Sequence, residues 1–478
     1  MKFAGSTRTL LSLFCLTLTI ASLPAPATAG PAAAKTVYIR DVPHVQQKPD
    51  FCGEACAAMY LARLGHRYDQ DAVFNASGLD PALARGCYTK ELNAALLKIG
   101  FLTGDVWQQV AVAEAPRQLE AQWQVLYADL AAGVPSIVCM HYDEREGASE
   151  HFRLVLGYDA TRDEVIFHEP AVAEGANRRL ARKTFLALWP LKYDARNWTV
   201  VRMRLEPGRI PPPTASPQHS EAALAQHMMK LKAKAPDGFS VVIERPFVVI
   251  GDDPEREVRR RARDTVRWSV DLLKQDYFQR DPEQIIDIWL FKDKRSYEHH
   301  TAKIFGDKPT TPYGYYSPAH RALIMNISTG GGTLVHEIVH PFIATNFPDC
   351  PSWFNEGLAS LYEQTGSRDG HIIGRTNWRL PGLQRAIRGG GLSSFEQLCK
   401  TSTREFYEDP RGTNYAQARY LCYYLQEQGK LHDFYLRFQH GAAEDPTGYK
   451  TLQAVLGEKD MAAFQKRWEK YVMALEYD

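Results

Sequence analysis

A proline-rich segment near the middle of the chain constrains the fold more than any other sequence feature. The segment reads Glu206-Pro-Gly-Arg-Ile-Pro-Pro-Pro-Thr-Ala-Ser-Pro217. Proline has no backbone N–H, so neither a helix nor a central strand can continue through such a run. A chain of 478 residues is also too long for one ordinary hydrophobic core. We therefore predict two domains, residues 36–205 and 221–478, joined by a linker at residues 206–220.

The first residues of the chain are typical of a secretory signal peptide. Lys2 and Arg8 make the start positive, and residues 10–23 form an apolar run. Ala27-Thr-Ala29 then offers a cleavage site, which predicts a signal peptide over residues 1–29. The alternative is an uncleaved anchor, but the run is shorter than the ~20 residues that cross a bilayer. We expect the mature protein to be secreted or periplasmic, with no stable membrane span after cleavage.

The overall charge argues against some classes of partner. The formal net charge is +1, so there is no excess of positive charge that would indicate binding to nucleic acid or to an anionic membrane. No sequence feature indicates the oligomeric state.

The cysteine count bears on the chemistry of the mature chain. Removal of residues 1–29 takes Cys15 from the eight cysteines of the sequence and leaves seven. An odd number in an oxidising compartment leaves at least one thiol unpaired or paired between chains. Cys52 is our candidate for a chemically active thiol. The alternative is a buried, inert cysteine.

Apolar spacing and turn residues predict an α+β fold in both domains. In the first domain two helices precede the strands, an order that favours α+β over a doubly wound sheet. The expected helices are residues 52–64 and 89–99, and the expected strands are 134–140, 151–157, 164–168 and 198–205. In the second domain a small sheet leads into a helical half. Its expected strands are 240–243, 247–250, 285–291 and 322–326, its expected helices are 254–277 and 294–305, and the chain is mostly helical from residue 332.

Two histidines and two glutamates in the second domain have the spacing of a catalytic zinc site. In His336-Glu337-Ile-Val-His340 the imidazoles lie one helical turn apart on the same face, so both reach one Zn²⁺. Glu337 beside them is positioned to act as a general base. The third ligand we predict is Glu356, in a downstream helix that begins after Pro351. The alternative is a helix with two incidental histidines. A structural zinc site is a further alternative, but such a site has no use for the base.

Pro341 directly follows the second histidine. Proline disfavours helical geometry in the residue before it, and its ring crowds the carbonyl four residues back. We expect the helix to kink or end at this point.

Residues 239–425 resemble the gluzincin-type zinc peptidases usually called peptidase MA-like. The resemblance rests on a strand–helix–strand lead-in, Tyr313-Gly-Tyr-Tyr316, Gly330-Gly-Gly-Thr-Leu-Val-His-Glu337 and Trp353-Phe-Asn-Glu-Gly-Leu-Ala359. It implies that His336, His340 and Glu356 bind Zn²⁺ and that Glu337 is the base. A later tyrosine often stabilises the oxyanion in similar enzymes, and Tyr415 resembles that residue. The alternative for Tyr415 is an aromatic residue that only packs in the core.

A second candidate site lies in the first domain. In Gln46-Gln-Lys-Pro-Asp-Phe-Cys52-Gly53 the cysteine begins a helix, where the helix dipole favours a thiolate. Gln46 can reach back as an oxyanion donor. His151 opens a strand, and a hairpin that pairs Gly157 with Asp163 brings His151 opposite Glu169. Cys52, His151 and Glu169 then have the roles of a Cys–His–acid triad.

Residues 38–171 resemble the C39 peptidase family, papain-like enzymes that include bacteriocin leader peptidases. The resemblance rests on the glutamine before Cys52-Gly53, the helix that follows, Tyr88-Thr-Lys-Glu-Leu92, and His151-Phe152 before a hairpin. Two features depart from the family. Glu169-Pro170 stands where Asp or Asn before proline is usual, and the transporter helices of leader peptidases are absent.

The residues leave alternatives open for the first domain. Cys52 and Cys56 could bind a metal with Cys87, or Cys52 could form a disulfide. The domain could also bind a peptide or partner without turnover. The reading that the sequence favours is an exported peptidase with a zinc site and a second, thiol peptidase domain. Its expected partner is a peptide or protein substrate.

Overall fold

The computed structural model describes residues 34–213, 219–309 and 311–477. The predicted signal peptide, residues 1–29, lies outside the described residues. The described structure is 47% helical and 18% strand, which is consistent with an α+β fold. Within these ranges no helix combines the length and the apolar character that crossing a bilayer requires.

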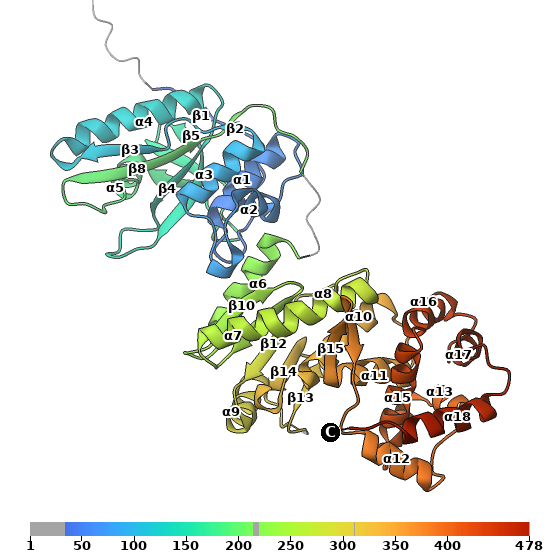
Figure 1. The fold of residues 1–478 in the computed structure, drawn as a ribbon. Coiled ribbons are helices and arrows are strands. Elements are labelled where there is room, and N and C mark those ends of the chain that lie inside the picture. Colours follow the sequence, from blue (N-terminus) through green and yellow to red (C-terminus); the bar gives the residue numbers. More distant parts are fainter. Residues whose placement is uncertain (1–33, 214–218, 310, 478) are drawn as a thin grey trace, which may run out of the picture.

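The N-terminal half is built on a seven-stranded sheet in the described residues (Figure 1). The strand order is β3-β8-β4-β5-β6-β7, and β1 pairs with β5. The strands are β1 (Val37–Tyr38), β3 (Trp107–Ala111), β4 (Ser136–His141), β5 (Glu150–Asp159), β6 (Glu164–His168), β7 (Arg178–Ala181) and β8 (Asn197–Arg204). The four predicted strands correspond to β4, β5, β6 and β8, whereas the short edge strands β3 and β7 were not predicted.

Helices cover both faces of this sheet. Successive side chains of a strand point to opposite faces, so neighbouring apolar residues of one strand enter two different cores. On one face Ile137 and Leu154 pack beneath α1 (Cys52–Arg63), α2 (Gln70–Ser77) and α3 (Thr89–Ile99). On the other face Val138 and Val155 pack beneath α4 (Ala115–Ala131) and α5 (Arg182–Leu188). The predicted helices α1 and α3 are confirmed to within a residue. The remaining elements of this half are η1 (Pro81–Leu83), η2 (Val112–Glu114), β2 (Phe101–Leu102) and β9 (Glu206–Pro207).

The C-terminal half is built around a five-stranded sheet in the described residues, of order β10-β11-β12-β14-β13. The strands are β10 (Ser240–Glu244), β11 (Phe247–Gly251), β12 (Ile286–Phe291), β13 (Gly314–Ser317) and β14 (Ala322–Asn326). The three central strands are parallel, and β10 and β13 pair antiparallel at the edges. The four predicted strands are confirmed, and β13 is the strand of this sheet that the sequence did not reveal.

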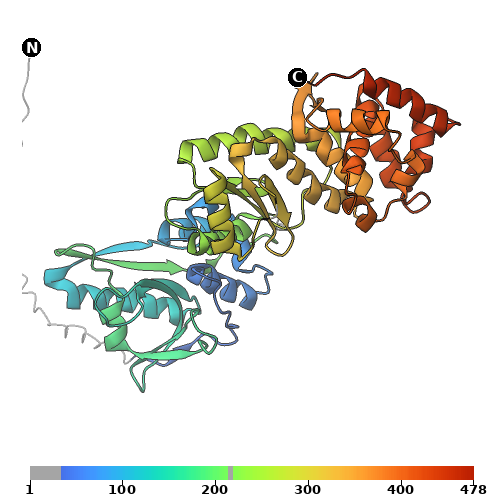
Figure 2. The ribbon, with the colours of Figure 1, turned by 90° about the horizontal axis from the view of Figure 1, so that it is seen from below.

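Helices cover both faces of this sheet and fill the rest of this half (Figure 2). On one face of the sheet lie α7 (Glu255–Arg261), η3 (Ala262–Arg267), α8 (Trp268–Asp276) and α10 (Gly332–Asn346), and on the other lie α6 (Glu221–Lys234), α9 (Lys294–His300) and η4 (Thr301–Phe305). The later elements are η5 (Ile327–Thr329), α11 (Ser352–Leu361), η6 (Tyr362–Gln364), β15 (Thr365–Arg368), β16 (His371–Gly374), α12 (Leu380–Arg388), α13 (Phe395–Cys399), α14 (Thr403–Tyr407), α15 (Thr413–Glu427), α16 (Leu431–Gly441), α17 (Tyr449–Leu456) and α18 (Met461–Met473).

The segment predicted as a linker is partly tied to the N-terminal half. Its first residues form β9, which pairs with β2, and the Gly208 amide donates to the Gly100 carbonyl over 2.9 Å. The helix that follows, α6, packs on both halves. Its Ala222 and Ala225 join the core of the N-terminal half, whereas Leu224 and Met228 join the core beneath the second sheet. The first residues of this segment and the helix after it therefore pack against folded structure, unlike a free linker.

Candidate functional sites

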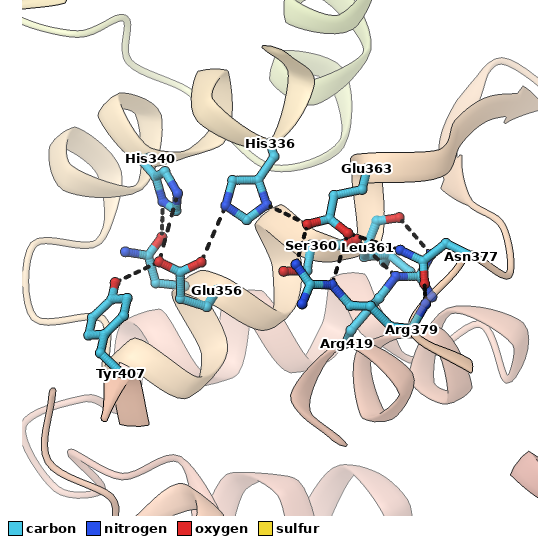
Figure 3. Close-up of polar contacts among 11 residues, drawn as sticks. His336, His340, Glu356, Ser360, Leu361, Glu363, Asn377, Arg379, Tyr407 and Arg419 are labelled. Carbon is cyan, nitrogen blue, oxygen red and sulfur yellow. Dashed lines mark hydrogen bonds and ion pairs between the residues drawn. The ribbon is translucent and has the colours of Figure 1, made fainter. Parts of the chain in front are cut away.

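Two helices bring the predicted zinc ligands together in the C-terminal half. His336 and His340 lie on α10, and Glu356 lies on α11, which packs between α10 and α15. One ligand atom from each of the three residues lies within 4.8 Å of the others. His336 Nε2 is 3.3 Å from Glu356 Oε2, and His340 Nε2 is 3.9 Å from Glu356 Oε1 (Figure 3). The spacing recognised in the sequence therefore corresponds to one compact group of donors.

The buried carboxylate of this group is negatively charged. Burial would raise the pKa of Glu356, but the contact with His336 and the charges of both histidines hold it at about 2. Burial would likewise lower the pKa of His336, but the carboxylates around it raise that pKa to about 9. The site therefore stabilises positive charge in the space between the three side chains.

The donors present fit a zinc ion. Glu356 Oε2 is buried and makes no hydrogen bond in the part of the chain that the structure describes, although His336 Nε2 lies 3.3 Å from it. A buried anionic oxygen is costly unless a cation compensates it, and a metal ion held between these side chains would do so. Two imidazole nitrogens and one carboxylate oxygen are the ligand set of many catalytic zinc sites.

The second nitrogen of each imidazole faces an oxygen, which leaves both Nε2 atoms toward Glu356. His340 Nδ1 is 3.0 Å from Asn355 Oδ1, and His336 Nδ1 is 3.5 Å from Glu363 Oε1. Such outer contacts orient metal-binding histidines. Sequence reasoning missed both residues. Asn355 directly precedes the predicted ligand, and that adjacency was the only available signal.

A polar network fixes Glu363 beside His336 (Figure 3). The Arg379 guanidinium donates to both of its oxygens, over 3.0 Å from Nε and 2.7 Å from Nη2. Asn377 Nδ2 donates to Glu363 Oε2 over 2.9 Å. The paired fork of Arg379 holds the carboxylate in one orientation, so Glu363 is presented to His336 in a fixed position.

The predicted base, Glu337, is half-buried on α10 beside the two histidines. Burial raises its pKa, whereas the charges of His336 and His340 lower it. A hydrogen bond from the backbone of Tyr316, on the edge strand β13, also lowers the pKa. The carboxylate therefore lies between the ligand helix and the edge of the sheet.

The tyrosine whose hydroxyl contacts the predicted zinc ligands is not the one that the sequence predicted. The Tyr407 hydroxyl, on α14, donates to Glu356 Oε1 over 2.6 Å. The ring of the predicted Tyr415, on α15, packs against Tyr407 and Phe406 with centroids 6.1 and 5.0 Å away. Among the described residues the Tyr415 hydroxyl makes no hydrogen bond. Two phenols therefore border this site.

In the N-terminal half, α1 places Cys52 against β5. Burial raises the pKa of the Cys52 thiol to about 12, although a hydrogen bond from the Phe152 backbone acts to lower it. The sequence predicted that the start of the helix favours a thiolate at Cys52. In the structure, burial of the thiol opposes that effect. Phe152 directly follows His151, but no hydrogen bond joins Cys52 to the His151 ring within the described ranges.

The predicted histidine and acid do lie together. His151 Nε2 is 2.5 Å from Glu169 Oε1, and Arg153 Nε donates to Glu169 Oε2 over 2.7 Å. Burial would raise the pKa of Glu169, but His151 and Arg153 lower it to about 2. Arg153, which sequence reasoning missed, therefore holds the acid that orients the imidazole and leaves Nδ1 of His151 for another partner.

The hairpin register that suggested this pair was wrong. Gly157 pairs with Ile166 rather than with Asp163, and the register shifts between Val155 and Gly157. An irregular residue in one strand offsets all later pairings. Glu169 reaches His151 because it follows the end of β6.

The structure places Gln46 at the surface, where its carbonyl accepts from Gln70 Nε2 over 2.8 Å. Its neighbour Gln47 lies deeper. The Gln47 amide donates to the Pro170 carbonyl over 2.9 Å, and its side-chain oxygen is buried without a partner in the described structure. Gln47 is therefore a second candidate for an amide near the triad.

A comparison with family models bears on this half. Residues 39–195 match the model described as Peptidase_C39 like family. The match supports a C39-like peptidase domain over these residues. The match extends the range of the resemblance seen in the sequence from residue 171 to residue 195. No curated protein matches the chain.

Proposed function

We propose that the protein is an exported peptidase that hydrolyses peptide bonds at a zinc site formed by His336, His340 and Glu356. The observation that carries the proposal is the convergence of these three donors from two helices within 4.8 Å. Zinc in such a site polarises the substrate carbonyl and activates water as the nucleophile. Export is proposed from the signal-peptide pattern of residues 1–29.

The residues around the donors have proposed roles that follow from their positions. Glu337 takes the proton of the attacking water and passes it to the leaving amine. Tyr415 is the proposed hydrogen-bond donor to the carbonyl oxygen. Tyr407 is a second candidate for that donor, because its hydroxyl lies on a zinc ligand.

An unbiased peptide pool tests the proposal. The mature protein is compared with Glu337→Gln, Cys52→Ala and His336→Ala, and the zinc content of each is measured. We expect one zinc per chain in all but His336→Ala, and loss of cleavage in Glu337→Gln with Cys52→Ala still active. Cleavage that persists in Glu337→Gln and vanishes in Cys52→Ala would assign catalysis to the thiol instead.

A second candidate function is thiol peptidase activity at Cys52, His151 and Glu169. The C39-like family match and the His151–Glu169 contact favour it. The raised pKa of Cys52 favours the alternative, a domain that binds a peptide without turnover. Alkylation by iodoacetamide separates them. Rapid modification of Cys52 near neutral pH supports the peptidase, whereas an unreactive thiol supports the binding module.

A further inference from the structure

A pocket of about 600 Å³ lies between α12 and the start of α15 in the C-terminal half. Three arginines line it, Arg379, Arg385 and Arg411, together with the exposed indole of Trp378. No residue that lines this pocket is acidic. The pocket therefore offers positive charge beside an aromatic face.

Two of the three arginines lack a counter-charge. Arg379 is engaged by Glu363. By contrast, in the described residues the guanidinium groups of Arg385 and Arg411 make no hydrogen bond or ion pair. Their charges are therefore available to an anionic ligand. A guanidinium presents its N–H donors in a planar fork that matches a carboxylate.

The pocket adjoins the proposed zinc site through Arg379. This side chain donates to Glu363, which lies 3.5 Å from His336 Nδ1. The Arg379 guanidinium carbon also lies 5.1 Å from the centre of the Tyr415 ring and 4.3 Å from that of Trp378. One residue thus forms a wall of the pocket and a support of the metal-binding group. The pocket and the proposed zinc site are therefore neighbours, joined by two successive polar contacts.

We propose that this pocket selects peptide substrates by a carboxylate, either an acidic side chain or the free C-terminus, held by Arg385 and Arg411. The inference rests on the proposed zinc peptidase function. Trp378 supplies an apolar face for the carbons that carry the carboxylate. Peptides without a carboxylate at the matching position lose the contribution of these two arginines.

Binding to the Glu337→Gln chain, loaded with zinc, tests the proposal without turnover. The probes are fluorescein-labelled alanine-rich peptides with one Glu or one Gln at each position in turn, each made with a free and with an amidated C-terminus. We expect one carboxylate position to strengthen binding by roughly five- to tenfold, measured by fluorescence anisotropy. The Glu arm and the C-terminal arm distinguish the two sources of the carboxylate.

Three variants in the same background locate the effect. Arg385→Gln and Arg411→Gln should each reduce the preference several-fold, and the double variant should abolish it. Arg388→Gln is the matched control, because Arg388 is an exposed arginine of the same helix that does not line the pocket. Arg388→Gln should keep the full preference.

The results that would overturn the carboxylate pocket differ from those that would overturn the zinc peptidase function. Equal binding of all probes, no measurable binding, or a preference that survives the double variant overturns the pocket assignment. A carboxylate preference in a zinc-loaded native chain that cleaves none of the peptides overturns the proposed peptidase function and leaves the pocket assignment standing.

Discussion

At the scale of single residues, the buried carboxylate of Glu54 gives the N-terminal half a pH dependence. Glu54 Oε1 accepts from the Cys87 amide over 2.8 Å, and Oε2 is buried without a hydrogen-bond partner in the described structure. Burial raises the pKa of Glu54 to about 7, despite the Cys87 hydrogen bond. The pKa in the unfolded chain is about 4.3, so the folded state binds the proton more tightly.

A raised carboxyl pKa stabilises the folded state at low pH. The contribution is fully present below about pH 4 and is lost as the pH rises through about 7, and it amounts to on the order of 4 kcal/mol. We predict that the free energy of unfolding of Glu54→Gln does not show this fall between low and neutral pH. Urea unfolding of the native and variant proteins at about pH 5 and about pH 8 measures the difference. Equal pH dependence in the two proteins would contradict the prediction.

Glu363 should tune metal affinity without contacting the metal. Glu363→Gln removes the negative charge near His336 Nδ1, so we expect zinc affinity to fall about 10- to 100-fold. Competition with a chelator measures the affinity. Glu427→Gln is the control, because it removes the same charge from a carboxylate that pairs with Arg368. A Glu363→Gln chain with unchanged affinity would show that the contact is structural only.

The sequence predicted some residues of the site and missed others for physical reasons. His336 and His340 were recognisable because the helical period fixes their common face. Glu363 was not, because it joins the site only through the η6 turn that follows α11. Tyr407 was not, because the position of α14 depends on tertiary packing.

At the scale of elements, Pro341 shows packing prevailing over local preference. The helix was expected to kink or end there, but α10 continues to Asn346 with Pro341 inside it. The residues beyond the proline, Phe342 and Ile343, are buried in the main core. Their burial offsets the lost backbone hydrogen bond. By contrast, the ends of α1 and α3 were predictable because the apolar spacing stops at Gly65 and Gly100, which both adopt a positive φ.

Close packing of α11 on α15 should make Gly357 irreplaceable. A Cβ at this position would meet the Ala418 carbonyl oxygen at 3.1 Å and the Ala418 Cβ at 3.2 Å. We predict that Gly357→Ala destabilises the protein by roughly 1–2 kcal/mol, because overpacking outweighs the gain in helix propensity. It should also weaken zinc binding, since Glu356 is adjacent.

Gly382→Ala is the matched control for this effect. Gly382 lies in α12, and only the end of the Arg385 side chain, at 3.9 Å, is near its missing Cβ. We expect a gain of roughly 0.5–1 kcal/mol from reduced freedom of the unfolded chain. Urea unfolding measures both variants. A stabilised Gly357→Ala chain would mean that α15 moves away at little cost.

At the scale of the whole molecule, α6 determines where the chain can be divided. Its Ala222, Ala225 and Met229 contact the N-terminal core, whereas Leu224, Met228 and Leu231 pack beneath the second sheet. The proline-rich segment predicted a division at this region. It could not predict that the helix after it contacts both halves, because the contact depends on side chains distant in sequence.

This arrangement predicts how two fragments should behave. A fragment of residues 219–478 keeps Leu224, Met228 and Leu231 on the sheet, and exposing Ala222, Ala225 and the partly buried Met229 costs roughly 2–3 kcal/mol. We expect it to fold, to unfold cooperatively in urea and to bind zinc. A fragment of residues 239–478, which starts where the gluzincin resemblance starts, uncovers the buried Val248 and Trp289. Loss of three large apolar side chains costs roughly 5 kcal/mol or more, a large part of the stability of most domains, so this fragment should be unfolded or aggregated. If the longer fragment also failed to fold, the two halves would be one cooperative unit and the proposed division at the proline-rich segment would be wrong.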